Sequence, residues 1–182
     1  MAKWSKLPGM HARLVLTIIG PDRPGIVDAV SATIASAQGS WQKSRFARLA
    51  DHFAGIVEVT VPSAAASGLT TALQALPGLS VTVTPATLEA LPTPARVAHF
   101  SFVGQDRPGL VQALSRVLAA AAVNVAELET RTFLAPMSGV SVFEAEAEVH
   151  LPAGLDVAQL TAQLETVARD LVVDIVFHEE PL

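Results

Sequence analysis

Apolar residues follow the same two spacings twice along the chain. Short β-rich stretches occupy residues 13–20 (RLVLTIIG) and 96–104 (RVAHFSFVG). Each is followed by a segment in which apolar residues recur every four positions, which puts them on one face of a helix. The pattern predicts helices over residues 24–37 and 108–121. The residues that mark these helices are Ile26, Val30, Ile34, Leu110, Leu114 and Leu118.

The rest of each half continues in the same order. The first half shows strands near 40–49 and 53–61, then a helix marked by Leu69, Leu73 and Leu76, and a strand over 79–85. The second half shows strands near 124–134 and 141–150, then a helix and a strand over 171–177. The residues that mark this second helix are Leu155, Leu160, Leu164, Val167 and Ala168. The order β-α-β-β-α-β is that of the ferredoxin-like fold. The predicted class is therefore α+β, with two such domains in tandem and antiparallel sheets covered by helices on one face.

We place the domain boundaries from this order and from a proline-containing stretch. The first domain covers residues 11–87, and the second covers residues 96–180. Residues 88–95 form the predicted linker, in which Pro92 and Pro94 restrict the backbone.

The two halves are copies of one another. The segment GPDRPGIVDAVS at residues 20–31 matches GQDRPGLVQALS at residues 104–115, an offset of 84. Further along, Phe53 matches Phe143, and the offset has grown to 90. The six additional residues fall in FLAPMSGVSVF, where a proline and a glycine suit a longer hairpin loop.

The repeated Asp-Arg-Pro-Gly turn is the strongest candidate for function. It lies between the first strand and the first helix, and the first turn of a helix offers unpaired N–H groups to an anion. Glycine has no Cβ, so a ligand can approach closely. The aspartates suit two roles that remain open here, a helix cap or a contact to the ammonium group of an amino acid. The structural alternative is a capped helix start with proline as its first residue.

Asn124 is the other polar residue that stands out. It opens the predicted second strand of the second half, and an amide can both donate and accept hydrogen bonds. The first half has Ser40 at this position. We therefore expect Asn124 to complete a ligand site with the turn at 104–109, and the two halves to bind unequally. A turn asparagine is the structural alternative.

Composition narrows the function classes. The chain has 182 residues, 51% hydrophobic, with no cysteine and a formal net charge of −5. Without cysteine there is no disulfide or thiolate metal site. A basic face for nucleic acid, an apolar run long enough for a membrane and a signal peptide are not evident. We predict a cytoplasmic protein without direct contact to nucleic acid or membrane. The histidines lack a metal-ligand spacing, and the sequence indicates no metal and no cofactor.

The form G-x-D-R-P-G-[IL]-V, repeated in a double βαββαβ, resembles the ACT domain family of small-molecule-binding regulatory modules. The stretch from Asn124 to Pro152 resembles the tandem ACT proteins typified by the glycine cleavage system transcriptional repressor family. The resemblance spans about residues 12–178. It implies a non-enzymatic protein that binds an amino acid, glycine or serine first by analogy, at interfaces between paired domains. It also implies a homodimer and a transcription-factor partner.

Carried over by position, the resemblance implies ligand contacts from both turns and from the second strand of the second half. The implied ligand-binding residues are Asp22, Arg23, Pro24, Gly25, Ile26, Asp106, Arg107, Pro108, Gly109, Leu110 and Asn124. The chain departs from the family at Ser40-Trp41, where relatives have asparagine followed by a small apolar residue.

Two other functions stay open at this stage. A protein-interaction module without a small ligand would use exposed surfaces such as the basic stretch at residues 45–53. An acylphosphatase-like enzyme shares the topology and uses an arginine on the first turn with an asparagine on the second strand, which Arg107 and Asn124 imitate loosely. Its glycine pattern does not match, and we see no catalytic motif in the sequence.

Overall fold

The computed structural model describes residues 11–86, 96–136, 138–171 and 173–179. Contacts within the chain divide it into two compact units, residues 1–90 and 91–182, and each unit is described by itself. The predicted linker at 88–95 lies outside the described residues.

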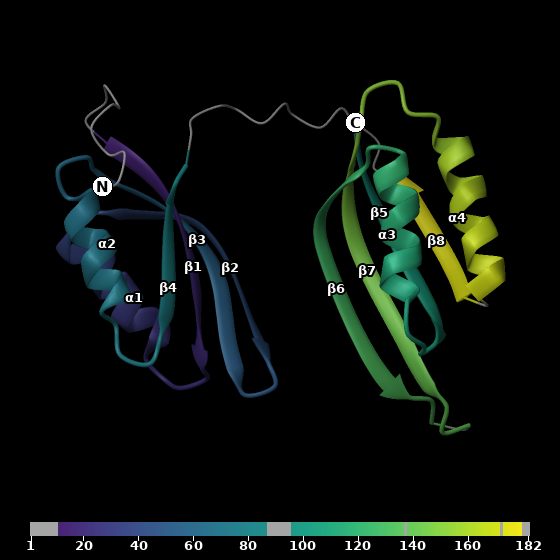
Figure 1. Ribbon diagram of the computed structural model, residues 1–182, viewed down its shortest axis with the longest axis horizontal. Coiled ribbons are helices and arrows are strands. Elements are labelled where there is room, and N and C mark those ends of the chain that lie inside the picture. Colours follow the sequence, from purple (N-terminus) through teal and green to yellow (C-terminus); the bar gives the residue numbers. More distant parts are fainter. Residues whose placement is uncertain (1–10, 87–95, 137, 172, 180–182) are drawn as a thin grey trace. The chain divides into compact units, whose positions relative to one another are not determined.

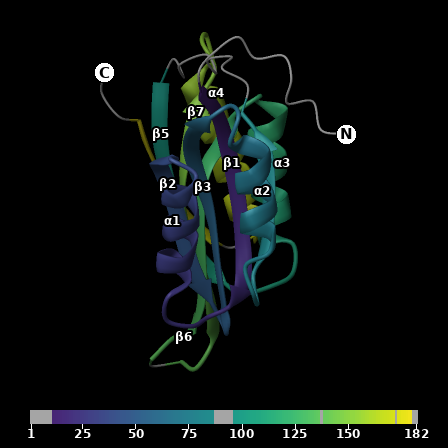
Figure 2. The same cartoon turned by 90° about the vertical axis from the view of Figure 1, so that its left-hand side faces the viewer.

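The first domain is a four-stranded antiparallel sheet with two helices on one face (Figures 1 and 2). The strand order in the sheet is β2-β3-β1-β4. Its elements are β1 (His11–Pro21), α1 (Ile26–Ser36), β2 (Ser40–Leu49), β3 (His52–Pro62), α2 (Ala66–Gln74) and β4 (Ser80–Pro85).

The second domain repeats this arrangement, with strand order β6-β7-β5-β8. Its elements are β5 (Arg96–Gln105), α3 (Leu110–Ala120), β6 (Asn124–Leu134), β7 (Ser141–Leu151), α4 (Val157–Leu171) and β8 (Val173–Glu179). The predicted fold, βαββαβ twice, is confirmed.

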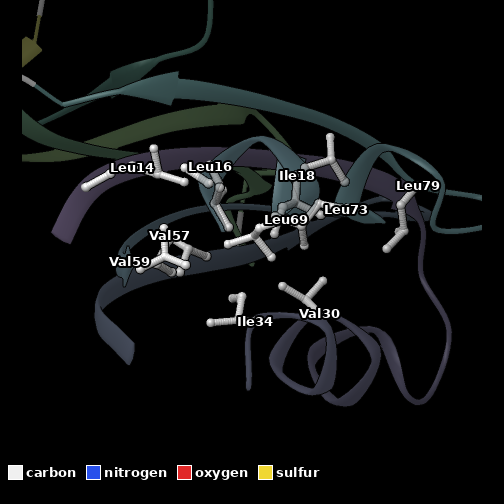
Figure 3. Packing of buried hydrophobic residues seen from close by; sticks show 14 of the residues in the cluster. Leu14, Leu16, Ile18, Val30, Ile34, Val57, Val59, Leu69, Leu73 and Leu79 are labelled. Carbon is white, nitrogen blue, oxygen red and sulfur yellow. The ribbon is translucent and has the colours of Figure 1, made fainter. Parts of the chain in front are cut away.

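Each core lies between the sheet and its helices. Alternate residues of β1 point toward the helices and are buried, because side chains alternate between the two faces of a strand. Figure 3 shows how the buried side chains of β1, β3 and both helices pack together. The central residues of this core are Leu14, Leu16, Ile18, Val30, Ile34, Val57, Val59, Leu69 and Leu73.

Strand register confirms the duplication and the change of offset. Gly20 pairs with Phe53 in the first sheet, and Gly104 pairs with Phe143 in the second. The hairpin between β2 and β3 turns through residues 50–51, whereas the hairpin between β6 and β7 turns through residues 135–140. Two of the six additional residues extend the ladder by one pair, Leu134 with Ser141, and the other four lengthen the hairpin loop.

The first helix of each domain begins two residues later than predicted. α1 starts at Ile26 and α3 at Leu110, and neither proline is the first helical residue. Gly25 and Gly109 precede the helices in the left-handed conformation, with φ of 89° and 95°. A helix cannot extend through a left-handed residue, so the prolines belong to the turn.

Candidate ligand-binding turns

Glycine is required at the end of both Asp-Arg-Pro-Gly turns because of the backbone conformation. Residues with a Cβ are disfavoured at positive φ, and the backbone φ is positive at both Gly25 and Gly109. A Cβ built at either position meets no heavy atom within 4 Å. The space beside each glycine, at the N-terminus of α1 or α3, is therefore open to a ligand.

The aspartates of the turns do not cap the helices. Within the described residues, no side chain caps the N-terminus of α1 or α3, so the capping interpretation is wrong. The backbone N–H of Asp22 donates instead to the carbonyl of Asp51, and that of Asp106 to the carbonyl of Ser141, both at 2.8 Å. These hydrogen bonds tie each turn to the adjacent hairpin and leave the carboxylates for other contacts.

The two carboxylates have different partners. Asp22 Oδ2 lies 2.9 Å from Nε of Arg48 on β2 and forms an ion pair with it. In the second domain the residue equivalent to Arg48 is Thr132, and Asp106 Oδ2 accepts a hydrogen bond from the Ser141 hydroxyl at 3.4 Å. The carboxylate in the first turn is paired with a cation of its own domain, while the carboxylate in the second is held by a neutral group.

Arg23 is engaged within its own domain. Its Nη2 donates to the carbonyl of Pro77, in the loop between α2 and β4, at 2.9 Å. The first turn is thus held by two arginine contacts, one from Arg23 and one from Arg48, and both restrict what its polar groups can offer to a ligand.

Acidic residues lie near the N-terminus of α1 but not at the equivalent positions of α3. Asp28 is in the first turn of α1, where α3 has Gln112. Asp51, in the hairpin joined to the first turn, corresponds to Ser141, and a side-chain hydrogen bond from His52 lowers the pKa of Asp51. A ligand carboxylate would meet more negative charge at the first turn than at the second.

Asn124 does not lie beside the turn of its own domain. It pairs with His150, which also pairs with Val97 near the start of β5. Asp106 follows Gln105, at the other end of β5. Eight residues of strand separate Val97 from Gln105, or roughly 27 Å at 3.4 Å per residue.

The expectation that Asn124 completes the turn at 104–109 is therefore wrong. The start of the second strand meets the end of the helix, whereas the turn lies at the start of the helix. The same separation applies to Arg107 and Asn124, so the domain lacks the pairing that an acylphosphatase-like site requires.

The helix-facing side of the edge strand also differs between the domains. In the first, Trp41 stacks on Phe46 with ring centroids 6.0 Å apart, and both pack against the core. The equivalent residues in the second are Val125 and Thr130. A small apolar pocket opens there between α3, β5 and β6. It is lined by Phe100, Phe102, Val111, Leu114, Ser115, Leu118, Val125 and Leu128.

Sequence reasoning missed this pocket, although the aligned repeat carried a signal. One copy of the duplicated strand has a tryptophan where the other has a valine. This difference implies that one copy fills a space that the other leaves open. Val111, two residues after Gly109, brings the pocket to the first turn of α3.

The described part of the chain lacks two further features. Its His, Asp and Glu side chains form no group of three or more that could hold a metal ion. Its helices include none with the length and apolar character that crossing a membrane requires.

The sequence model of the ACT domain family matches residues 12–83, which is nearly all of the first domain. The first domain is an ACT domain, and the second domain repeats its fold. It is 26% identical over 164 residues to the glycine cleavage system transcriptional repressor of Escherichia coli, covering 87% of this chain and 85% of that protein. The repressor of Shigella flexneri is similar to the same extent.

Two solved structures resemble the whole chain. An unknown protein from Galdieria sulphuraria is 30% identical, with a TM-score of 0.81, over 94% of this chain and 99% of that one. A putative glycine cleavage system transcriptional repressor has a TM-score of 0.72 at 20% identity, over 96% of this chain and all of that one. The second comparison supports the tandem fold.

Proposed function

We propose that this protein is a non-enzymatic regulator that binds an amino acid at the Asp-Arg-Pro-Gly turn of its second domain. The observation that carries the proposal is the turn itself. In an ACT-type domain, a left-handed glycine faces open space at the start of a helix that no described side chain caps. The backbone N–H groups of Leu110 and Val111 suit a carboxylate, and Asp106 suits an ammonium group.

The second domain is favoured over the first for three reasons. Asp106 is not paired with an arginine equivalent to Arg48, the first turn of α3 has Gln112 in place of an aspartate, and a small apolar pocket begins at Val111. Together these features make the second turn the better host for a zwitterion. Asn124, at the start of β6, does not reach the turn of its own domain.

The regulated process is transcription, and the protein acts through a partner protein. This part of the proposal rests on the curated relatives, which are transcriptional repressors by name. A net charge of −5 disfavours direct contact with DNA phosphates and suits a protein partner. The cytoplasmic location predicted from the sequence stays a prediction.

Isothermal calorimetry tests the ligand. Each common amino acid is titrated into the natural chain, starting with glycine and serine, and we expect saturable binding for at least one. Asp106→Asn removes the charge with little change of shape, and we expect about tenfold weaker binding. Asp22→Asn is the matched control in the first domain and should leave that affinity unchanged. If no amino acid binds, the protein-interaction module becomes the better explanation.

A turnover assay tests the absence of catalysis. We expect acyl phosphates and phosphate esters to be hydrolysed no faster by the natural chain than by a variant with Arg23→Ala and Arg107→Ala. Hydrolysis that depends on these arginines would overturn the non-enzymatic assignment.

A further inference from the structure

The outer face of the second sheet, on the side away from α3 and α4, carries directly opposed glutamates. Alternate residues of β7 are buried beneath the helices, so the glutamates between them point outward. Glu129 of β6 pairs with Glu146, and Glu127 pairs with Glu148. Residues directly opposite each other lie on the same face of a sheet, so all four carboxylates belong to this outer face.

The fold itself does not require these glutamate pairs. Like charges directly opposite each other destabilise a sheet. At the equivalent positions of the first domain, Lys43 pairs with Glu58, and Arg45 pairs with Ile56. The second domain therefore contains a repulsion that its sister domain lacks, and cations supplied by a bound molecule would relieve it.

Arg131 shows how this face binds a cation. Its Nε donates a hydrogen bond to Glu144, and its guanidinium carbon lies 5.4 Å from the centroid of the Phe133 ring. The hydrogen bond and the charge of Glu144, together with the charges of Glu146 and Glu129, raise the pKa of Arg131. One arginine thus lies among three carboxylates, and negative charge remains on the face.

Apolar side chains on the same face favour a protein as the bound molecule. Val103 pairs with Glu144, and Ser101 pairs with both Glu146 and Val176, so both valines lie on the outer face. Val103 is 36% exposed and Val176 is 47% exposed. Protein interfaces combine apolar contacts with polar ones, and this face offers both.

We propose that the outer face of the second sheet binds a basic surface of the partner protein, with lysine or arginine side chains against the opposed glutamates. Glu127 and Glu129 are two residues apart on one strand, or roughly 7 Å, so cations at a similar spacing fit them. A protein that binds DNA carries such cations for its phosphate contacts. The inference rests on the proposed action through a partner protein and is independent of the amino-acid site.

A helical peptide tests the face separately from the strand edges. The probe is a capped, alanine-rich helix with arginine at every fourth position, which places its cations about 6 Å apart. Its backbone groups are paired internally, so it cannot add to the edge of β6 as a further strand. Calorimetry should show binding that weakens as salt rises. The same helix with glutamine in place of arginine should not bind.

Neutralising one opposed pair should weaken this binding. In Glu129→Gln with Glu146→Gln, we expect about fivefold lower affinity for the arginine helix. Asp28→Asn with Glu165→Gln removes the same charge from exposed helix positions and should leave the affinity unchanged. Urea unfolding gives a second readout. The Glu129→Gln with Glu146→Gln variant should unfold at a higher urea concentration than the natural chain, because a repulsion is removed.

Four results would overturn the proposal. The natural chain does not bind the arginine helix, or the folded Glu129→Gln with Glu146→Gln variant binds it as tightly as the natural chain does. The control variant loses as much affinity, which would indicate a response to net charge alone. Sedimentation velocity shows self-association of the natural chain that this glutamine variant loses, which would assign the face to a second copy. None of these results bears on the titrations with amino acids, so the two proposals fail separately.

Discussion

Arg48 and Asp22 form an ion pair across the turn of the first domain, with Nε 2.9 Å from Oδ2, and Thr132 replaces that arginine in the second domain. The same four-residue turn therefore exists in two electrostatic states within one chain. In the first domain the carboxylate has a cationic partner before any ligand arrives. In the second domain, the Asp106 carboxylate accepts a hydrogen bond from the neutral Ser141 hydroxyl instead. This difference is the basis of the unequal binding that we propose.

An arginine placed at position 132 should pair with Asp106 as Arg48 pairs with Asp22, and so compete with a ligand for the carboxylate. In Thr132→Arg, we expect the new guanidinium to pair with Asp106 and to weaken amino-acid binding by up to about fivefold, since an exposed ion pair of this kind contributes less than about 1 kcal/mol. Calorimetry measures the change. Arg48→Thr is the reciprocal control; it should lower the free energy of unfolding by less than about 1 kcal/mol, because the pair is largely exposed. Unchanged binding in a folded Thr132→Arg would contradict the role of Asp106.

Exchanging Trp41 and Val125 should move the apolar pocket between the domains. In Val125→Trp, the indole is expected to fill the space between α3 and β6, keep the fold and reduce ligand affinity. In Trp41→Val, the first domain should lose about 1–3 kcal/mol of stability, less than a fully buried tryptophan because Trp41 is partly exposed. Urea unfolding and ligand titration give both values. If Val125→Trp binds ligand as tightly as the natural chain, the pocket has no part in binding.

Gly109→Ala should destabilise the second domain by about 1 kcal/mol, because an L-residue resists the left-handed conformation at φ 95°. Open space around the position means that no steric clash adds to this value. Gly68→Ala is a matched control, since Gly68 is also unobstructed but lies within α2, where alanine should stabilise by roughly 0.5–1 kcal/mol. Thermal unfolding of both variants measures the change in stability, which should be negative for Gly109→Ala and positive for Gly68→Ala. A Gly109→Ala variant as stable as the natural chain would refute the conformational argument.

Gly55→Ala should displace the ring of Phe46. The two residues pair across β2 and β3, and a Cβ at Gly55 would overlap the ring. Because Trp41 stacks on Phe46, tryptophan fluorescence and near-UV circular dichroism should change with stability. The second domain has Ala145 opposite Thr130, so Gly55→Ala combined with Phe46→Thr should remove the overlap. An unaltered Trp41 environment in Gly55→Ala would show that Phe46 can yield without cost.

Most of the fold was predictable because it depends on the local spacing of apolar residues and on a sequence repeat. Four-residue spacing marked α1 and α3, and the matched segments located equivalent strands in both halves. The helix starts were wrong because the conformation of Gly25 and Gly109, rather than the preference of proline for a first turn, decides where the helix begins. The placement of Asn124 was wrong because a helix of 11 residues is about 16 Å long, so its end is far from its start.

The sequence by itself determined a duplicated βαββαβ chain with a glycine turn at the start of each first helix, since these features depend on spacing and on the conformational range of single residues. Only the tertiary structure decided that Asp22 contacts Arg48, that Asp106 contacts Ser141, and that Trp41 packs against the core of the first domain while the equivalent space beside Val125 in the second domain stays open. These contacts join strands and turns that are distant along the chain, and they depend on sheet register and on which face each side chain occupies. The two copies of one motif therefore differ through their neighbours, which the motif itself does not contain.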